Sequence, residues 1–204
     1  MASRDATIVL ASSNPGKLGE IRAILRGTGL AVRPQGELDV ADAPETGQTF
    51  IENAIIKARN ASLATGLPAL ADDSGLCVDA LGGEPGVRSA RYAGSAATDA
   101  DNVAKLMATL SSVADGLRTA RFQCVIALLR HAADPTPIIC QGSWDGTIGT
   151  APAGSNGFGY DPVFQVPAHG CSAAELDSDT KNRISHRGRA LAELKRQLVS
   201  LEDL

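Results

Sequence analysis

The sequence predicts an α/β protein built around a mixed β-sheet. Short apolar runs typical of strands are interspersed with segments of helical periodicity along the 204 residues. Two runs in the second half, 122–129 and 137–144, lie close enough in sequence to pair as a hairpin, which an all-parallel sheet does not contain. Aromatic residues make up only 3% of the chain, so Ala, Val, Leu and Ile must fill the core. We expect a single domain that spans residues 1–204.

The chain begins with a strand, a turn and a helix. Residues 6–11 (ATIVLA) form the apolar run of a buried strand. The turn of residues 12–17 (SSNPGK) follows, with Asn14 suited to the N-cap and Pro15 to the first helical position. Apolar residues then recur at helical spacing until two glycines end the helix. Residues 30–33 are expected to form a second strand.

A capped helix and a strand with an acidic motif follow. Thr49 and Glu52 have the spacing of a capping box, which predicts that a helix begins there. Residues 67–71 are expected to form a short strand that ends at the motif 72–75 (DDSG), and residues 76–80 a separate strand. One face of the helix carries apolar and small residues, namely Phe50, Ala54, Ala58 and Ala61.

The second half continues with a helix, two strands and a final helix. Thr98 is expected to cap the first of these two helices. The run 122–129 is typical of a strand covered on both faces. Residues 137–144 are expected to pair with that strand. The last helix has three leucines in register, Leu191, Leu194 and Leu198.

Composition excludes several classes of protein. The formal net charge is −4, which disfavours broad binding to nucleic acid but leaves room for a small anionic ligand. No segment approaches the roughly 18 apolar residues that a membrane helix needs. The run 6–11 is too short for a signal peptide, so we expect a cytoplasmic protein. The four cysteines are widely spaced, and neither disulfides nor a zinc site is expected.

The turn between the first strand and the first helix is a candidate anion site. Backbone N–H groups at a helix N-terminus and the helix dipole together favour a bound phosphate. Lys17 falls at the third helical position, where a capping box would place Glu, and a bound phosphate would make this cation favourable. The alternative is an ordinary capped helix with a solvated lysine. Ala11 and Leu18 exclude a Walker P-loop.

Adjacent carboxylates are the second candidate feature. Asp72 and Asp73 point to opposite faces if they lie on a strand, although a turn could bring both inward. Together with Glu45 they suit Mg²⁺, which binds through a few carboxylates and substrate phosphates. The alternative is a turn in which each Asp bonds its own backbone. Asn53 and Lys57, one turn apart, either line a cleft or face solvent, and alone their pattern favours solvent.

Two further groups are polar or aromatic. The loop 157–162 (GFGYDP) places Phe158 between glycines, where a base could stack on its ring; the alternative is a tight turn with this ring in the core. Lys181, Ser185, His186 and Arg187 form a polar group before the last helix. Ser185 could cap that helix, and His186 and Arg187 could donate hydrogen bonds to carbonyl oxygens of a base. The sequence contains neither HExxH nor GxSxG.

The motifs and their order along the chain resemble those of the inosine triphosphate pyrophosphatase family, and within it those of the bacterial dITP/XTP branch. The resemblance runs from about residue 8 to residue 198, and Asn156 is its one minor departure. The residues that carry it are Ser13-Asn14-Pro15-Gly16-Lys17 with Glu20, Glu45-Thr46-Gly47, Thr49-Phe50-Ile51-Glu52-Asn53-Ala54 with Lys57-Ala58, Ala71-Asp72-Asp73-Ser74-Gly75-Leu76, Ser89-Ala90-Arg91-Tyr92, Gly157-Phe158-Gly159-Tyr160-Asp161-Pro162 and Ser185-His186-Arg187.

The resemblance implies an elongated fold with a long mixed central sheet, two lobes flanked by helices, a cleft between them, and a homodimer. It implies Mg²⁺-dependent hydrolysis of ITP, dITP and XTP to the monophosphate and pyrophosphate. Mg²⁺ would be held by Glu45 and Asp73 with Asp72 close by, and Asp73 would accept the proton of water. The triphosphate would be held by Ser12, Ser13, Asn14, Pro15, Gly16, Lys17, Lys57 and Ser74. The nucleotide and base pocket would consist of Phe158, Gly159, Tyr160, Asp161, Lys181, His186 and Arg187.

Three competing functions are considered. A nucleotide sensor needs the phosphate cradle but not the carboxylates, and the presence of Asp72 and Asp73 beside Glu45 counts against it. A nucleic-acid-modifying protein needs a basic stripe, which the acidic balance disfavours. A general phosphatase would release orthophosphate instead of pyrophosphate, and product analysis separates the two.

Overall fold

The computed structural model describes residues 6–199. The chain forms two compact units. In the described part, the first unit comprises residues 6–73, 124–142 and 187–199, and the second comprises residues 74–123 and 143–186. Three of the strands contribute residues to both units, because each crosses a boundary between these ranges.

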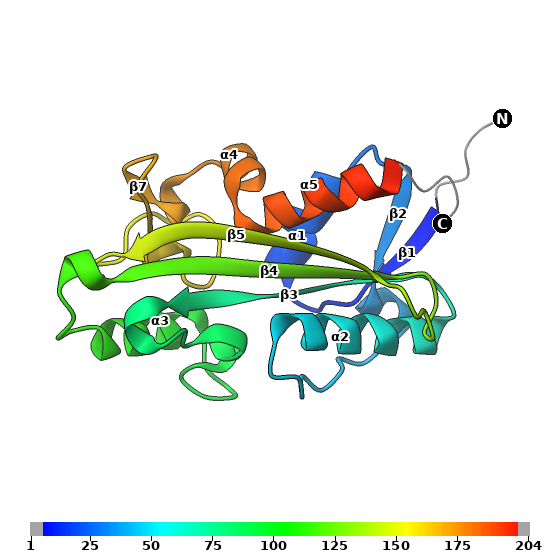
Figure 1. The fold of residues 1–204 in the computed structure, drawn as a ribbon, viewed down its shortest axis with the longest axis horizontal. Coiled ribbons are helices and arrows are strands. Elements are labelled where there is room, and N and C mark those ends of the chain that lie inside the picture. Colours follow the sequence, from blue (N-terminus) through cyan, green and yellow to red (C-terminus); the bar gives the residue numbers. More distant parts are fainter. Residues whose placement is uncertain (1–5, 200–204) are drawn as a thin grey trace. The chain divides into compact units, whose positions relative to one another are not determined.

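A seven-stranded sheet with the order β2-β1-β3-β4-β5-β6-β7 organises the chain (Figure 1). β1 pairs in parallel with β2 and β3, whereas β6 pairs antiparallel with β5 and β7. The predicted mixed sheet and the predicted pairing of β4 with β5 are therefore confirmed. The strands are β1 (Ala6–Leu10), β2 (Leu30–Pro34), β3 (Ala69–Val78), β4 (Thr119–Leu129), β5 (Ile138–Ile148), β6 (Phe164–Val166) and β7 (Cys171–Ser172).

Five α-helices accompany the sheet in the described residues, and three of them start at the predicted caps. Asn14 caps α1 and Pro15 is its first residue. Thr49 and Thr98 cap α2 and α3 through complete capping boxes. Short α4 was not predicted. The helices are α1 (Pro15–Leu25), α2 (Phe50–Thr65), α3 (Asp99–Thr109), α4 (Ser178–Ile184) and α5 (His186–Val199).

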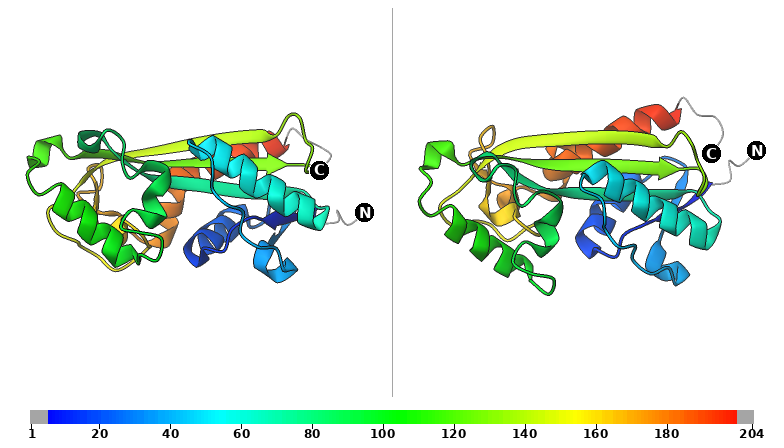
Figure 2. Two further views of the ribbon diagram at one scale, coloured as in Figure 1. Left: turned by 90° about the horizontal axis from the view of Figure 1, so that it is seen from below. Right: turned by 60° about the horizontal axis from the view of Figure 1, so that its bottom comes forward.

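In the first unit, strand alternation sends side chains into two cores on opposite faces of the sheet. Ile8, Leu10 and Leu70 pack with residues of α1 and α5, such as Leu191. On the other face, small residues of β1 and β3 pack against the predicted alanine face of α2, whose Ala54, Ala58 and Ala61 are fully buried. Figure 1 and Figure 2 show α2 on one side of the strands and α1 and α5 on the other.

The second unit has one apolar core in which the chain's few aromatic residues are concentrated. Phe122, Trp144 and Phe164 contact one another, with ring centroids of Phe122 and Phe164 4.6 Å apart. Leu106 and Leu110 of the α3 segment join this core, as the helical spacing predicts.

One strand prediction is wrong. Residues 67–71 and 76–80 were expected to be separate strands that flank an acidic turn, but β3 runs without interruption from Ala69 to Val78. The motif DDSG therefore lies inside a strand. Its acidic residues find cationic partners in the structure, described below, and so need no solvated turn.

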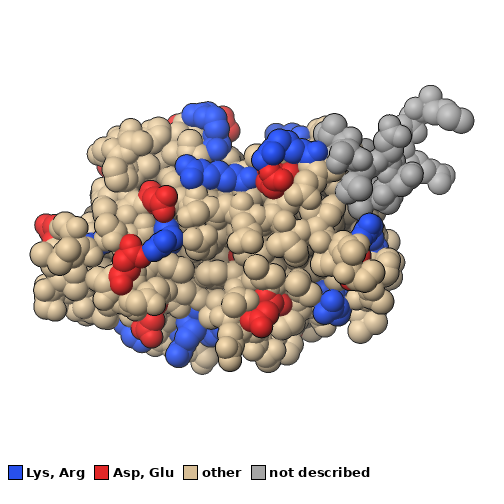
Figure 3. Space-filling model, in the orientation of Figure 1, with Lys and Arg blue, Asp and Glu red and all other residues tan. Residues whose placement is uncertain are grey.

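No helix among the described residues combines the length and the apolar character needed to cross a bilayer. On the face drawn in Figure 3, acidic and basic side chains are interspersed. The expectation that nucleic acid is not a partner stays a prediction.

Candidate functional site

The N-terminus of α1 is built as the sequence predicts. The Asn14 side chain accepts a hydrogen bond from the Lys17 amide at 3.0 Å, and the Ser12 hydroxyl accepts one from the Asn14 amide at 3.2 Å. The Ser13 hydroxyl instead donates to Asp42 at 2.7 Å. Among the described residues, the backbone amides of Ser13 and Gly16 have no hydrogen-bond acceptor. These donors are therefore available to an anion.

The Lys17 side chain joins this turn to the acidic motif. Its Nζ lies 2.7 Å from an oxygen of Asp72, whose side chain is fully buried. The other Asp72 oxygen accepts from Arg187 Nε at 2.9 Å, and Arg187 also pairs with Glu20 at 2.5 Å. The thiol of Cys124 lies 3.1 Å from the same Asp72 oxygen. The predicted cradle and the acidic motif thus belong to one cluster.

The cations around Asp72 keep it ionised. Burial by itself raises the pKa of Asp72, but the charges and hydrogen bonds of Arg187 and Lys17 outweigh it and hold the pKa well below the usual value. Burial lowers the pKa of Arg187, yet Asp72 and Glu20 raise it overall. Asp72 is thus ionised at neutral pH and holds two cations.

Asp73 faces a different set of partners. Lys57 Nζ lies 2.6 Å from an Asp73 oxygen and 3.0 Å from an oxygen of Glu45. The Lys57 side chain is only 14% exposed, so the alternative of solvent exposure that its helical pattern favoured is wrong. Asn53, one turn earlier, is fully buried. The two residues form a polar face of α2 directed into the protein.

Burial raises the pKa of Asp73, and nearby Glu45 adds to the effect, whereas Lys57 and Lys17 oppose it without cancelling it. For Lys57, burial lowers the pKa, but Asp73 and Glu45 raise it overall. Asp73 therefore binds a proton more readily than an ordinary Asp while it remains next to a cation.

The topology explains why these groups meet. β1 ends at Leu10, and its pairing with β3 extends only to Leu70. Past this point β3 continues without β1 beside it, and the turn that follows β1 occupies this side. Ligands of parallel sheets bind outside the carboxyl ends of strands for this reason. Alternation places Asp72 on the α1 and α5 face and Asp73 on the α2 face, as the sequence predicts.

Of the carboxylates in this cluster, only some are placed to bind a hard cation such as Mg²⁺. Among the described residues, no group of three or more His, Cys, Asp and Glu side chains is arranged to hold a metal ion by itself. Glu45 and Asp73 do share one cation, the Lys57 ammonium. Two carboxylates completed by substrate phosphates are the donor set that Mg²⁺ prefers. Asp72 is already paired with Arg187 and Lys17, so Glu45 and Asp73 fit a metal better than Asp72 does.

In the second unit, Asp161 organises the loop that contains Phe158. Its carboxylate accepts from the Phe158 amide at 2.9 Å and from Lys181 Nζ at 2.5 Å. Gly157 has a φ of +75°, and a Cβ there would lie 2.1 Å from the Asp161 carboxylate. The glycine is thus required by the approach of Asp161, and not only by room for a ligand.

Phe158 is not part of the apolar core. Its ring is half-buried, and Lys181 Nζ lies 5.0 Å from the ring centroid. The next amide, of Gly159, donates to Asp99 at the start of α3 at 2.7 Å. A groove of about 450 Å³ separates α3 from this loop. Its lining includes Val103, Met107, Asn156 and Phe158.

The residues of the polar group predicted before the last helix have different partners in the structure. Lys181 pairs with Asp161, and the His186 ring stacks on Phe122 with centroids 4.7 Å apart. Arg187 pairs with Asp72 and Glu20 and is almost fully buried. Tyr160 is also buried, and its hydroxyl donates to the Ser89 carbonyl at 2.8 Å. Ser74 is the half-buried residue after Asp73 in β3.

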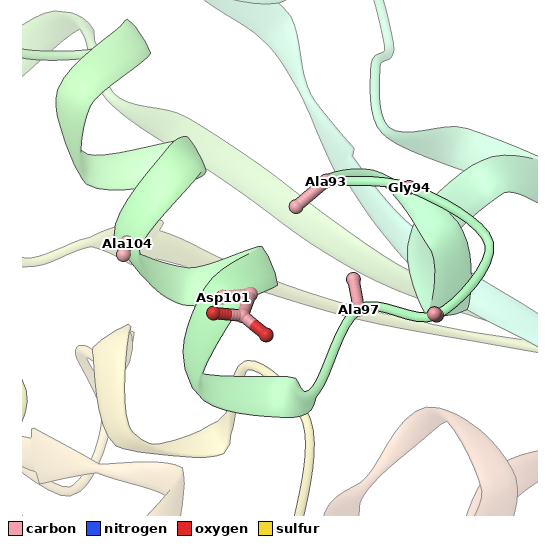
Figure 4. A pocket seen from close by; sticks show the side chains of 6 residues that line it. Ala93, Gly94, Ala97, Asp101 and Ala104 are labelled. Carbon is pink, nitrogen blue, oxygen red and sulfur yellow. The ribbon is translucent and has the colours of Figure 1, made fainter.

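A second hollow of about 500 Å³ lies beside the N-terminal half of α3 (Figure 4). Alanines and a glycine form most of its lining. Its one charged residue, Asp101, serves the capping box by accepting from the Thr98 amide and hydroxyl. This hollow therefore lacks groups for a charged ligand.

Sequence reasoning missed several residues that hold the site. Glu20 follows Lys17 by three residues on α1, so helical spacing could have placed it on the same side. Cys124 lies within an apolar run, and Asp99 within the first turn of a helix, where acidic residues are ordinary. Neither of these two gave a signal that pointed to a site.

The fold and the site define an α/β protein in which a helix N-terminus with available amide donors is joined to a buried cluster of cationic side chains and carboxylates. The model of the Ham1 family matches residues 8–197, and the chain belongs to that family.

Relatives and solved structures agree with this assignment. The chain is 60% identical over 195 residues to the dITP/XTP pyrophosphatase of Xanthomonas campestris pv. campestris (strain 8004), covering 95% of this chain and 98% of that one. It is 57% identical over 187 residues to the dITP/XTP pyrophosphatase of Vibrio cholerae serotype O1, covering 92% and 94%. The structure of a HAM1 protein from Coxiella burnetii superposes with a TM-score of 0.89 at 54% identity, covering 96% and 99%.

Proposed function

We propose that this protein hydrolyses non-standard purine nucleoside triphosphates, namely dITP, ITP and XTP, to the nucleoside monophosphate and pyrophosphate. The observation that carries the proposal is the contact between Lys17, at the anion-binding helix terminus, and Asp72, beside Asp73. Its similarity to proteins named dITP/XTP pyrophosphatase, across nearly its whole length, supports the same substrate class. The reaction removes abnormal nucleotides from the precursor pool.

The first task is to hold a highly charged triphosphate. The unpartnered amides of Ser13 and Gly16, the α1 dipole and the Lys17 ammonium supply donors and positive charge on one turn. Lys57 supplies a second ammonium. Such fixed charges also stabilise the pyrophosphate as it leaves, without reorganising at the moment of reaction.

The second task is to activate water. Asp73 is the best candidate for the general base because it lies beside Lys57, which also contacts Glu45, whereas both oxygens of Asp72 are already held by Lys17 and Arg187. The base would take a proton from the water that attacks the α-phosphorus. Help of this kind contributes about 10²–10⁴-fold.

Glu45 and Asp73 are the proposed ligands of Mg²⁺, with Asp72 close by. The bound ion would neutralise charge on the phosphates and on the leaving pyrophosphate. Lys57 now holds the same two carboxylates in place, which keeps their spacing suitable for a cation.

The third task is to select the base, and the loop around Phe158 has suitable groups. Its partly exposed ring offers a stacking surface, worth about 1–3 kcal/mol per base. Hypoxanthine and xanthine carry a C6 carbonyl, which accepts hydrogen bonds, whereas adenine carries a C6 amino donor. Sites with matched polar groups reject the wrong partner by about 10⁴-fold or more. Arg187 is paired with Asp72 and Glu20, and Lys181 with Asp161, and both remain candidate donors to the base.

We further propose that the enzyme is a cytoplasmic homodimer, as expected from its resemblance to the family. Sedimentation-equilibrium analysis of the purified protein tests the dimer directly, and a monomer mass at micromolar concentration would contradict it.

The decisive test of function is product analysis. The protein is incubated with Mg²⁺ and dITP, ITP, XTP, GTP or ATP, and products are separated by anion-exchange chromatography. We expect monophosphate and pyrophosphate from dITP, ITP and XTP, with much lower kcat/KM for ATP. Diphosphate and orthophosphate would contradict the proposal, as would equal kcat/KM for ATP and ITP.

A further inference from the structure

Asn53 is a fully buried polar residue on α2. Its side-chain oxygen accepts a hydrogen bond from the Gly47 amide at 2.8 Å. Lys57 lies one helical turn further along α2, on the same side. The residue therefore sits between the loop that carries Glu45 and the lysine that Glu45 contacts.

The loop is pressed against the first turn of α2. A Cβ at Gly47 would lie 2.5 Å from the Cβ of Glu52 and 2.8 Å from Asn53 Oδ1, so no other residue fits without a shift. Three successive amides are held by this turn, since Gly47 donates to Asn53 while Gln48 and Thr49 donate to Glu52. The Glu52 bonds are exposed, whereas the Asn53 bond ends in a buried side chain.

Glu45 is thereby anchored from two directions. Its carboxylate contacts Lys57 at 3.0 Å, and the chain two residues later is fixed by Asn53. Lys57 in turn contacts Asp73 at 2.6 Å. If the Gly47 bond were lost, the segment could move away from α2, and the separation of Glu45 and Asp73 would no longer be set by the helix.

Only half of the Asn53 carboxamide is hydrogen-bonded within the described residues. Among the described residues, no atom accepts a hydrogen bond from its Nδ2, which is buried. An unpaired buried donor is unfavourable, so the bond from the Gly47 amide is the hydrogen bond that distinguishes this side chain from the buried alanines Ala54 and Ala58 of the same helix.

We infer that Asn53 is a positioning residue: its carboxamide fixes the 45–47 segment so that Glu45 and Asp73 are held at the spacing needed for the proposed metal ion. The inference rests on the proposed function. Residues that orient metal ligands typically contribute about 10- to 100-fold in metal affinity or activity.

The test compares three variants of the full-length protein. Asn53→Ala removes the acceptor, and Asn53→Asp keeps an oxygen that can accept from Gly47. Ser62→Ala is the matched control, because Ser62 is also buried on α2 and its hydroxyl has no partner among the described residues. Hydrogen–deuterium exchange of residues 45–49 reports on the anchor, and electron paramagnetic resonance of Mn²⁺ reports on metal binding. Neither readout requires turnover.

For Asn53→Ala we expect faster exchange confined to 45–49, at least tenfold weaker Mn²⁺ binding, and a lower kcat on dITP with KM changed less than threefold. Asn53→Asp is expected to restore slow exchange, and Ser62→Ala to resemble the wild type in every readout. Unchanged exchange and Mn²⁺ affinity in Asn53→Ala would overturn the inference, as would equally fast exchange across all of α2 and β3. If wild-type protein did not hydrolyse dITP, the proposed function would fail while the exchange and Mn²⁺ measurements would still decide on Asn53.

Discussion

At the scale of single residues, the neighbours Asp72 and Asp73 differ because strand alternation gives them different partners. Asp72 contacts Lys17 and Arg187, and its pKa is held well below the usual value. Asp73 contacts Lys57 and has a raised pKa because burial outweighs that contact. One carboxylate is therefore suited to hold cations and the other to accept a proton.

The Asp73→Asn variant should retain its fold and lose catalysis. The amide cannot accept a proton from water, so kcat on dITP should fall by about 10²-fold or more. Because burial raises the pKa of Asp73, its replacement should cost less stability at pH 7 than the replacement of Asp72, although Lys57 loses one of its two carboxylate partners. Steady-state kinetics and circular dichroism are the measurements. Turnover within a few-fold of wild type would rule out Asp73 as the base.

The Asp72→Asn variant should behave in the opposite way with respect to stability. Breaking a buried ion pair leaves Arg187 with less compensation, which typically costs about 3–5 kcal/mol. Because the folded pKa of Asp72 is lowered, this stabilisation is present above the unfolded value of about 3.9 and is lost as the pH falls further.

Urea unfolding of wild type and Asp72→Asn at pH 7 and at pH 3 measures this difference. The gap between the two proteins should be large at pH 7 and should shrink at pH 3. A gap that stays constant, or one that widens on acidification, would contradict the assignment of Asp72 as an ion held by Arg187 and Lys17.

At the scale of secondary structure, the N-terminus of α1 combines a cap with the proposed anion site. Asn14 satisfies the Lys17 amide, which leaves the amides of Ser13 and Gly16 without a partner among the described residues. The capping side chain thus serves the helix while other donors remain for a ligand.

Two substitutions at Asn14 should separate these roles. Asn14→Ala removes the cap and should lower stability by about 0.5–2 kcal/mol. Asn14→Asp keeps the cap but places a negative charge beside the phosphates, so stability should be retained while KM for dITP rises about tenfold, equivalent to about 1.4 kcal/mol. Thermal unfolding and steady-state kinetics provide both values. An unchanged KM in Asn14→Asp would place the triphosphate elsewhere.

How far the sequence could predict these elements depends on the range of the interactions. Caps are local, so Asn14, Thr49 and Thr98 indicated the starts of three helices. The continuity of β3 through Asp72 and Asp73 was not predictable, because buried carboxylates within a strand require cations supplied from elsewhere.

The partners of Asp72 and Asp73 come from distant parts of the chain, which is why the sequence did not predict how the site is assembled. Arg187 is separated from Asp72 by 115 positions in the sequence, and no local pattern connects them. The sequence therefore suggests that Arg187 donates hydrogen bonds to a base, whereas the structure pairs it with Asp72 and Glu20. The polar face formed by Asn53 and Lys57 was visible in the helical spacing, but only the structure shows that it is directed inward.

At the scale of the whole molecule, charge creates a problem for an anionic substrate. The formal net charge is −4, so long-range attraction of a triphosphate is not expected. The central cluster does not reverse this, because its cations Lys17, Lys57 and Arg187 face four carboxylates. Those four are Glu20, Glu45, Asp72 and Asp73.

The proposed Mg²⁺ should therefore be needed for binding of the triphosphate and not only for its hydrolysis. With the metal removed by EDTA, the affinity for a non-hydrolysable dITP analogue should fall at least about tenfold, or about 1.4 kcal/mol. Isothermal titration calorimetry with and without Mg²⁺ measures this change. A variant of a proposed metal ligand tests whether the effect of Mg²⁺ depends on the carboxylates. In Glu45→Gln, which removes one negative charge and one proposed ligand, the dependence on Mg²⁺ should weaken. Equal affinity of the wild type in EDTA and in Mg²⁺ would show that the protein's own cations suffice, and would remove the electrostatic reason for a metal at Glu45 and Asp73.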